Sequence, residues 1–451
     1  MYRMTLTVCV ISLLTASTVF GQGGGNQNGG NQNGGVGGIR IDPDGVLNQA
    51  QITTLSSREL RSMLRKSAGE SLPEDLNRAS EQRMISLRAL DLEINRLMDD
   101  GQPLPPAIIN LAGLTRIDLV SFTDDGIDVI IAGPAEGFAP GPDGRQIGVQ
   151  TQRPVLCLED LLIALRTANG RSSFGCSFDP VPERLAKTLQ LLQQDMAAAN
   201  AAAAQQAFQQ IGQVLGNWNI SVNGVPSDSR MAVTMVEADF MLKRLTTGDA
   251  NPDVSGFKSY LSMMSSKTNG LQRWWFSPLY ESIETNPART VFRFSGARLQ
   301  VSAQDELVDA DGNRRDAATT QISFQKYAQQ FTRKMDALAE NVPAIAQLQN
   351  TVDVLVTATL IQRAQSSGSL RWTPTVLSDE QRLPLQKFNV PREVPSLVRV
   401  RMAGQRTVLG VIAGGVTINP RRILDDVQLA EDQTRLQISP HDAGQQTWWW
   451  D

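Results

Sequence analysis

Residues 223–244, NGVPSDSRMAVTMVEADFMLKR, constrain the fold of this 451-residue chain more than any other stretch. A polar turn opens a helix that carries apolar residues on almost every side. A helix that is apolar all round has to be enclosed by other elements, since an exposed apolar face would remain in water. We therefore expect this helix in the core, with Ser227 or Asp228 as its N-cap and with Glu237 and Asp239 in its middle.

The charges of this helix have a structural explanation. Residues two apart on a helix point about 200° apart, so Glu237 and Asp239 cannot face one substrate together. Asp239 precedes Lys243 by four residues, which is the favourable order for an ion pair. Arg230 and Arg244 lie seven residues before and after Glu237 and share its face. The pattern favours paired charges over catalytic carboxylates.

Strand and helix patterns alternate irregularly along the chain. LTRIDLVSF (114–122) and GIDVIIAG (126–133) flank an Asp-Asp-Gly turn, which predicts a β-hairpin. Residues 289–304 alternate apolar and polar side chains, which is typical of a half-buried strand. Without a regular βαβ order, the pattern predicts an α+β fold of mixed short antiparallel sheets and several helices.

Residues 182–212 predict one long Ala-rich helix or a helical hairpin. Leu185, Leu189, Leu192 and Met196 recur at steps of three and four, and Ala continues the seam. The seam is shorter than three heptads, which favours packing within the chain. The alternative is an intermolecular coiled coil that would make the protein a helix-mediated oligomeric scaffold.

The N-terminus has the pattern of an export signal. Arg3 precedes a short apolar run from Leu6 to Val19, and small residues near Gly21 suit signal peptidase. No other run is long and apolar enough to predict a transmembrane anchor. We expect an exported protein, located in the periplasm, in the cell envelope or outside the cell.

Composition shifts divide the chain into six segments. They are a signal peptide (1–21), a Gly/Asn/Gln-rich disordered tether (22–38), an N-terminal α+β region (39–180), a central region of helices and sheet (181–370), a β-rich segment (371–440) and a Trp-rich tail (441–451).

The cysteines suit an oxidising compartment. Cys9 leaves with the signal peptide, and an even number remains, Cys157 and Cys176. A disulfide between them would close a loop of about 20 residues and stabilise the fold by roughly 3 kcal/mol. The alternative is two free thiols.

Most familiar chemistries lack their residues. His441 is the single histidine, so a Ser-His-Asp triad or a His-rich zinc site is not expected. The chain has no phosphate-binding loop of the Walker type and no long basic run, which weighs against nucleotide and nucleic-acid binding. We predict no metal, no cofactor and no catalytic residue. Carboxylate-pair hydrolysis needs no histidine and is retained as an alternative.

Five residues are candidates for ligand binding: Asp228, Arg230, Glu237, Trp274 and Trp275. Adjacent residues on a strand point to opposite faces, so at most one of the two tryptophans is exposed. An exposed Trp would offer a stacking surface for a sugar.

Several blocks together resemble a known family. The blocks are AGLTRIDLV, IAGPAEGF, RPVLCLEDLLIALR, GVPSDSRMAVTMVEADFMLKR and RWWFSPLYES. They are similar to an exported protein family of planctomycete bacteria that is classed as a domain of unknown function. The resemblance runs from about residue 84 to 295 and implies compartment and lineage, with no activity.

These observations favour a non-catalytic binding or structural-association protein of the periplasm or cell envelope. Its expected partner is an envelope protein or a polysaccharide. The alternatives are a carboxylate-dependent hydrolase of an extracellular polymer such as glycan, and the helix-mediated scaffold described above.

Overall fold

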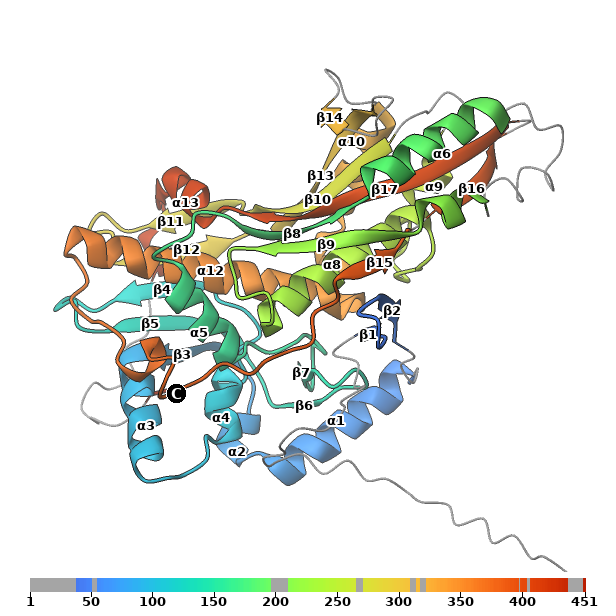
Figure 1. Ribbon diagram of the computed structural model, residues 1–451. Coiled ribbons are helices and arrows are strands. Elements are labelled where there is room, and N and C mark those ends of the chain that lie inside the picture. Colours follow the sequence, from blue (N-terminus) through green and yellow to red (C-terminus); the bar gives the residue numbers. More distant parts are fainter. Residues whose placement is uncertain are drawn as a thin grey trace, which may run out of the picture. The chain divides into compact units, whose positions relative to one another are not determined.

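A computed structural model describes most of the chain (Figure 1). The described residues are 38–50, 55–195, 210–264, 271–308, 314–316, 322–396, 398–403, 406–436 and 449–451. All of them belong to one unit, residues 35–451. The predicted signal peptide, and the predicted tether apart from Gly38, lie outside the described residues.

The larger of two main sheets has eight strands among the described residues. Its order is β14-β13-β10-β17-β8-β9-β15, with β16 paired to β17. Neighbours are antiparallel except β10 and β17, which run parallel. The strands are β8 (Phe174–Asp179), β9 (Asn217–Asn223), β10 (Leu271–Leu279), β13 (Arg298–Val308), β14 (Arg314–Asp316), β15 (Glu393–Pro395), β16 (Val398–Ala403) and β17 (Arg406–Ile418).

The second sheet has six described strands in the order β18-β11-β12-β4-β5-β3. They are β3 (Ser80–Ser86), β4 (Leu119–Phe122), β5 (Val129–Ala135), β11 (Ser282–Thr285), β12 (Val291–Ser295) and β18 (Gln428–Leu429). Two small hairpins pair β1 (Ile39–Ile41) with β2 (Leu47–Gln49), and β6 (Phe138–Pro140) with β7 (Gln146–Gly148). The six-stranded sheet contains strands from all three predicted folded regions: 39–180, 181–370 and 371–440.

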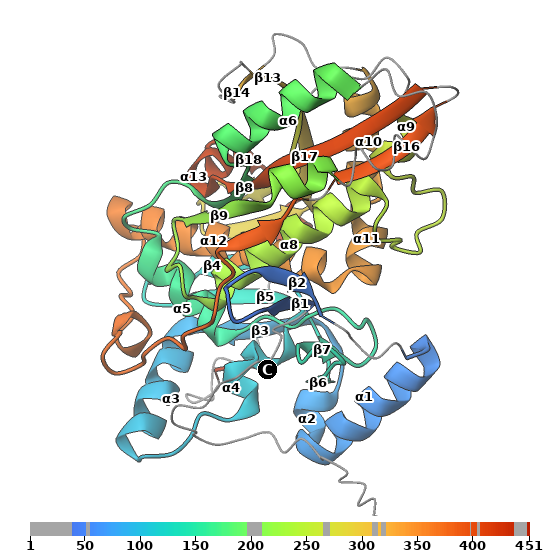
Figure 2. The ribbon, with the colours of Figure 1, turned by 45° about the vertical axis from the view of Figure 1, so that its right-hand side comes forward.

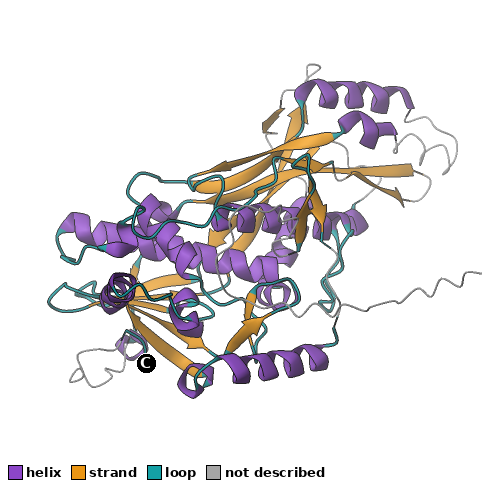
Figure 3. Cartoon of the chain, turned by 60° about the horizontal axis from the view of Figure 1, so that its bottom comes forward, coloured by secondary structure: helices purple, strands orange, loops and turns teal. Residues whose placement is uncertain are grey.

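Helices fill the space between the two sheets and cover their outer parts (Figures 1 and 3). The α-helices are α1 (Ser57–Ser71), α2 (Glu74–Asn77), α3 (Leu87–Asp99), α4 (Pro106–Ile109), α5 (Leu158–Thr167), α6 (Pro182–Asp195), α8 (Arg230–Thr247), α9 (Tyr260–Met263), α10 (Ile322–Arg333), α11 (Met335–Asn341), α12 (Pro343–Ser367) and α13 (Pro420–Ile423). Short 3₁₀ turns are η1 (Leu111–Gly113), η2 (Val376–Ser378), η3 (Leu424–Asp426) and η4 (Gln433–Leu436). The predicted α+β fold class is confirmed.

The central helix of the fold is α12. By length and composition it could cross a membrane, but its apolar window is completely buried within the protein, as in the core helix of a soluble domain. It packs against α5 and α8, and it carries buried polar residues among its apolar ones. Such residues need internal partners, because a buried polar group without a hydrogen bond is costly.

The predicted core helix is α8, and it packs on β8, β10 and β17. Its N-cap is Ser229, whose Oγ accepts a hydrogen bond from the amide of Ala232 at 3.2 Å. The expectation that Ser227 or Asp228 caps it is therefore wrong by one or two residues. A left-handed Gly248 ends the helix.

The predicted single strand over 289–304 is two strands in different sheets. β12 belongs to the six-stranded sheet and β13 to the eight-stranded sheet, and the chain bends between them at Gly296 (φ 91°) and Arg298 (φ 62°). A positive φ at arginine has no sequence signal, since arginine rarely adopts it. β10 and β11 are likewise consecutive strands in different sheets, separated by Tyr280 and Glu281, so the chain passes between the sheets twice.

Other local predictions have mixed outcomes. The 114–133 hairpin forms as β4 and β5, although β4 begins only at Leu119. The long Ala-rich helix is described as α6 up to Asp195, and residues 196–209 lie outside the described part.

Candidate binding site at the bend between the two sheets

A pocket of about 840 Å³ opens where the chain passes from one sheet to the other. Its floor is the larger sheet, and α13 and η3 form one wall; Figures 1 and 2 show α13 beside this end of β17. Its lining residues are Trp275, Ser277, Pro278, Leu279, Tyr280, Glu281, Ser282, Ile283, Gln300, Thr417, Asn419, Arg422, Ile423, Asp425, Asp426, Val427 and Gln428. The volume is in the range of ligand pockets.

The two adjacent tryptophans of β10 point to opposite faces of the sheet, as predicted. Trp274 is fully buried and stacks on Phe324 with a ring-centroid distance of 5.0 Å. Trp275 is only partly buried and lines the pocket. The Arg273 guanidinium lies 5.4 Å from the centroid of the Trp275 ring. Trp274 is therefore a core residue, and Trp275 remains a candidate for ligand contact.

Hydrogen-bonding groups of both kinds surround Trp275. Ser277 follows two residues later on the same strand and face, and Gln300 lies directly opposite Ser277 on β13. The α13 wall adds Arg422 as a donor and the carboxylates Asp425 and Asp426 as acceptors, all of them exposed. Such a mixed lining can bind a neutral molecule rich in hydroxyl groups.

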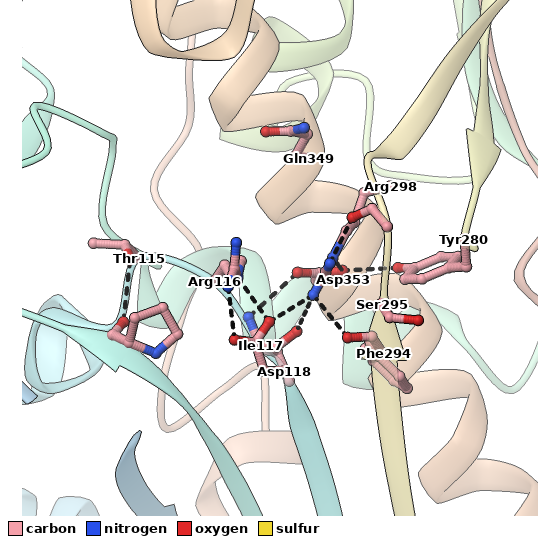
Figure 4. A network of polar contacts seen from close by, with 12 residues as sticks. Thr115, Arg116, Ile117, Asp118, Tyr280, Phe294, Ser295, Arg298, Gln349 and Asp353 are labelled. Carbon is pink, nitrogen blue, oxygen red and sulfur yellow. Dashed lines mark hydrogen bonds and ion pairs between the residues drawn. The ribbon is translucent and has the colours of Figure 1, made fainter. Parts of the chain in front are cut away.

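The pocket wall is fixed to the core by Tyr280. Its hydroxyl donates a hydrogen bond to Asp353 Oδ1 of α12 at 2.8 Å (Figure 4). Asp353 also accepts from the Ile117 amide at 3.2 Å and from Arg298 Nε at 3.3 Å. One carboxylate of the central helix therefore holds three segments: the β10–β11 bend, the β12–β13 bend and the approach to β4.

Arg298 completes this network from its strained position. Its Nη2 donates to Asp118 Oδ1 at 2.7 Å and to the Ile117 and Phe294 carbonyl oxygens, and its Nη1 donates to the Gly296 carbonyl oxygen at 2.6 Å (Figure 4). The Arg298 side chain is 6 % exposed. A left-handed arginine is costly, and the contacts that its side chain gains here offset that strain.

Burial controls the ionisation of this network. Burial raises the pKa of Tyr280 well above its usual value, and the negative charge of Asp353 adds to this effect. Burial also raises the pKa of Asp353, against the opposing influence of Arg298. For Arg298, burial acts to lower the pKa, but Asp353, Tyr280 and Asp118 together raise it. Tyr280 therefore stays a hydrogen-bond donor throughout the physiological range.

The other candidate ligand residues lie away from the pocket. Asp228 is exposed before α8, and its main-chain oxygen accepts from the Phe388 amide at 2.8 Å. Arg230 forms an ion pair with Asp160 of α5. The lining of the pocket includes neither residue.

Glu237 pairs with a residue that the sequence did not indicate. Its carboxylate is 4 % exposed and forms an ion pair with Arg145, and it accepts from the Gly38 amide at 2.7 Å. Arg244 instead pairs with Asp249 at 2.8 Å. Although they share a face of α8, these three residues do not pair with one another: Arg230, Glu237 and Arg244 each have a partner elsewhere.

Asp239 and Lys243 form the predicted ion pair, but in a fully buried position. Lys243 Nζ also lies 4.0 Å from the centroid of the Phe178 ring, a cation–π contact with β8. The two carboxylates in the middle of α8, Glu237 and Asp239, are thus both paired with cations inside the protein, which agrees with a structural role.

The two cysteines are free thiols, so the structure does not contain the predicted disulfide. Cys157 lies near Arg230, at the start of α8, where that charge acts on its pKa. Cys176 lies near Asp239 and Lys243, two to four turns further along the same helix. Burial raises the pKa of both thiols. Cys157 directly precedes α5 and Cys176 lies within β8, so the two thiols belong to different elements and pack against different parts of α8.

Sequence reasoning missed most of the pocket. Glu281, Gln300, Arg422, Asp425 and Asp426 come from three separate parts of the chain, and no local pattern links them. Trp275 was the one detectable member. Within the described ranges, no group of three or more His, Cys, Asp or Glu residues could hold a metal ion.

The fold and the site define a class: an α+β protein with an open, polar pocket that has a tryptophan on its floor. A family model described as "Protein of unknown function (DUF1598)" matches residues 176–260. The match runs from β8 into α9 and includes none of the pocket lining. It supports the resemblance to a domain-of-unknown-function family. No curated protein and no solved structure matches the chain.

Proposed function

We propose that this protein is an exported, non-catalytic binding protein that holds a polysaccharide segment in the pocket over Trp275. The observation that carries the proposal is the half-buried Trp275 ring on the floor of an open polar pocket. An indole ring packs well on the apolar face of a sugar, and hydroxyl, amide and charged groups around it can bind the sugar hydroxyls. The open form of the pocket suits a polymer that continues beyond it.

Hydrolysis of the same polymer is the second candidate, since three carboxylates line the pocket: Glu281, Asp425 and Asp426. A carboxylic acid that donates a proton at neutral pH is normally kept protonated by an apolar environment. All three carboxylates are exposed, and Asp425 forms an ion pair with Arg363 at 2.7 Å. This arrangement favours binding over cleavage.

Affinity electrophoresis tests the proposal. The full chain is run through gels that contain xylan, laminarin, hydroxyethyl cellulose, alginate or dextran, one polymer at a time. We expect retardation by at least one polymer, and at least tenfold weaker retardation of Trp275→Ala. Leu92→Ala is the matched control, because Leu92 is an exposed apolar residue on α3, outside the pocket.

Two results would overturn the proposal: the absence of retardation by every polymer, or equal retardation of wild type and Trp275→Ala. Release of reducing ends that Glu281→Gln abolishes would favour the hydrolase. The exported location rests on residues 1–21 alone. N-terminal sequencing of protein recovered from the periplasm tests it, and the expected first residue is Gln22.

A further inference from the structure

The last described residues, 449–451, pair with the edge of the six-stranded sheet through an isolated antiparallel bridge. β3 is the outermost strand of that sheet, and Ile85 makes an antiparallel bridge with Trp450. The Ser86 amide donates to the Trp449 carbonyl oxygen at 2.9 Å, and the Asp451 amide donates to the Met84 carbonyl oxygen at 3.3 Å. Figures 1 and 2 both show residue 451, marked C, beside β3.

Side chains strengthen this main-chain pairing. Asp451 Oδ1 accepts from the Met84 amide at 2.6 Å. The Arg83 guanidinium lies 5.0 Å from the centroid of the Trp450 ring, and Arg83 Nε donates to the Asp451 carbonyl oxygen at 3.1 Å. Trp449 and Trp450 pack partly buried against the core. Each of the three residues therefore contacts β3: Trp449 through Ser86, Trp450 through Arg83 and Asp451 through Met84.

Arg83 is held in place independently of this segment. Its Nη1 donates to the carbonyl oxygens of Leu76 and Ala112, and its Nη2 to those of Asp75 and Arg78. Three of these carbonyls lie at the C-terminal end of α2, where a helix leaves such groups without partners. Four of the five hydrogen bonds of Arg83 therefore remain when residues 449–451 are removed.

A strained turn supports the same guanidinium. Leu111, Ala112 and Gly113 all have positive φ angles, of 41°, 49° and 76°. Two of them are not glycine, so the turn is costly. It directs the Ala112 carbonyl to within 2.7 Å of Arg83 Nη1. The fold thus holds a buried cation next to the edge of β3 that residues 449–451 cover, and a sheet edge of this kind can pair with an extended peptide that carries an acidic residue.

We propose that the edge of β3 with Arg83 is a peptide-binding site for an extended aromatic–aromatic–acidic segment, which this chain fills with its own residues 449–451. The partner is a second copy of this chain, since every copy carries the segment that fits. Main-chain pairing with β3 gives affinity that does not depend on the peptide's side chains. Arg83 contacts the aromatic ring, and the Met84 amide donates to the carboxylate of the acidic residue. This site is separate from the pocket over Trp275 and does not depend on it.

Fluorescence anisotropy tests the proposal with a labelled peptide of residues 445–451, QQTWWWD. The acceptor is the full chain with Trp450→Ala and Asp451→Ala, which weakens its own segment. We expect this double variant to bind the peptide at least tenfold more tightly than the wild type, whose site is occupied. The matched control is the peptide with asparagine in place of the acid, QQTWWWN, which should bind at least fivefold more weakly.

Hydrogen exchange provides a second measurement, made on a chain with a single substitution. The amides of Met84 and Ser86 should exchange faster in the full-length Asp451→Asn variant than in wild type. Added QQTWWWD should slow them again. Equal peptide affinity of the folded double variant and wild type, or fast exchange that the peptide does not slow, would overturn the proposal. The segment would then only cover a strand edge.

Discussion

The Tyr280 hydroxyl donates to Asp353 Oδ1 at 2.8 Å, and this bond joins the wall of the pocket to the buried helix α12. Tyr280 sits at the bend where the chain leaves the larger sheet, and Arg298 sits at the bend where it returns. Both residues contact the same carboxylate. The pocket therefore owes its position to a single buried acid on α12.

Removing the Tyr280 hydroxyl should destabilise the fold moderately. Tyr280→Phe loses a hydrogen bond to a charged group, which costs about 1.5–3 kcal/mol of unfolding free energy. Arg298→Met should cost more, about 3–5 kcal/mol, since it leaves the Asp353 carboxylate buried without its cation. Urea unfolding measures both. An Arg298→Met variant as stable as the wild type would show that the network does not hold the two bends.

The cap of α8 gives a prediction with an internal control. Ser229→Ala should lower the unfolding free energy by about 0.5–2 kcal/mol, since the Ala232 amide loses its acceptor. Ser227→Ala, two residues earlier and exposed, should have little effect. Thermal unfolding of the two variants compares them directly. A larger loss of unfolding free energy for Ser227→Ala than for Ser229→Ala would show that Ser227 is the N-cap, as the sequence predicts.

These positions show what sequence patterns can and cannot reveal. The all-round apolar pattern of α8 predicts its burial, and the period of two predicts the opposite faces of Trp274 and Trp275, since both depend only on neighbours along the chain. The Glu237 partner is different. Arg145 lies 92 residues away, and no local pattern connects them.

The change from the six-stranded to the eight-stranded sheet near Arg298 could not be predicted from the sequence for a related reason. The alternation of residues 289–304 continues through the bend, so the pattern resembles one strand. Only tertiary contacts, those of Arg298 with Asp353 and Asp118, make its positive φ tolerable. The pocket that the bend creates could not be predicted without that switch.

Glu237 should prove to be a structural residue. Glu237→Gln leaves the Arg145 guanidinium without one of its two carboxylates and should cost about 3 kcal/mol of unfolding free energy. Glu93→Gln is the matched control, since Glu93 forms an exposed ion pair with Arg96 and should cost less than about 1 kcal/mol. Equal losses in the two variants would contradict the buried pairing.

Glu159 predicts a pH dependence of stability. Burial, with the neighbouring charge of Asp160, raises the pKa of Glu159 from 4.5 to about 7. Between these values the folded state keeps a proton that the unfolded state releases. The contribution of Glu159 to the unfolding free energy therefore falls as pH rises through this window, and levels off above about pH 7.

Glu159→Gln should remove that dependence. The difference in unfolding free energy, variant minus wild type, should be larger at pH 8 than at pH 5. The expected increase is about 1–3 kcal/mol, after allowance for partial exposure of the side chain. Urea unfolding at the two pH values measures the difference. If the variant and the wild type changed in parallel between pH 5 and pH 8, Glu159 would not be the group responsible.

Calorimetric titration is the most direct test of whether the pocket over Trp275 binds a sugar polymer. The titrant is a hexasaccharide of the polymer that retards the full chain most strongly. We predict that Trp275→Ala weakens binding at least tenfold while its unfolding midpoint stays close to that of the wild type, and that Trp275→Phe recovers part of the loss. Equal affinities of the wild type and Trp275→Ala would contradict binding in this pocket.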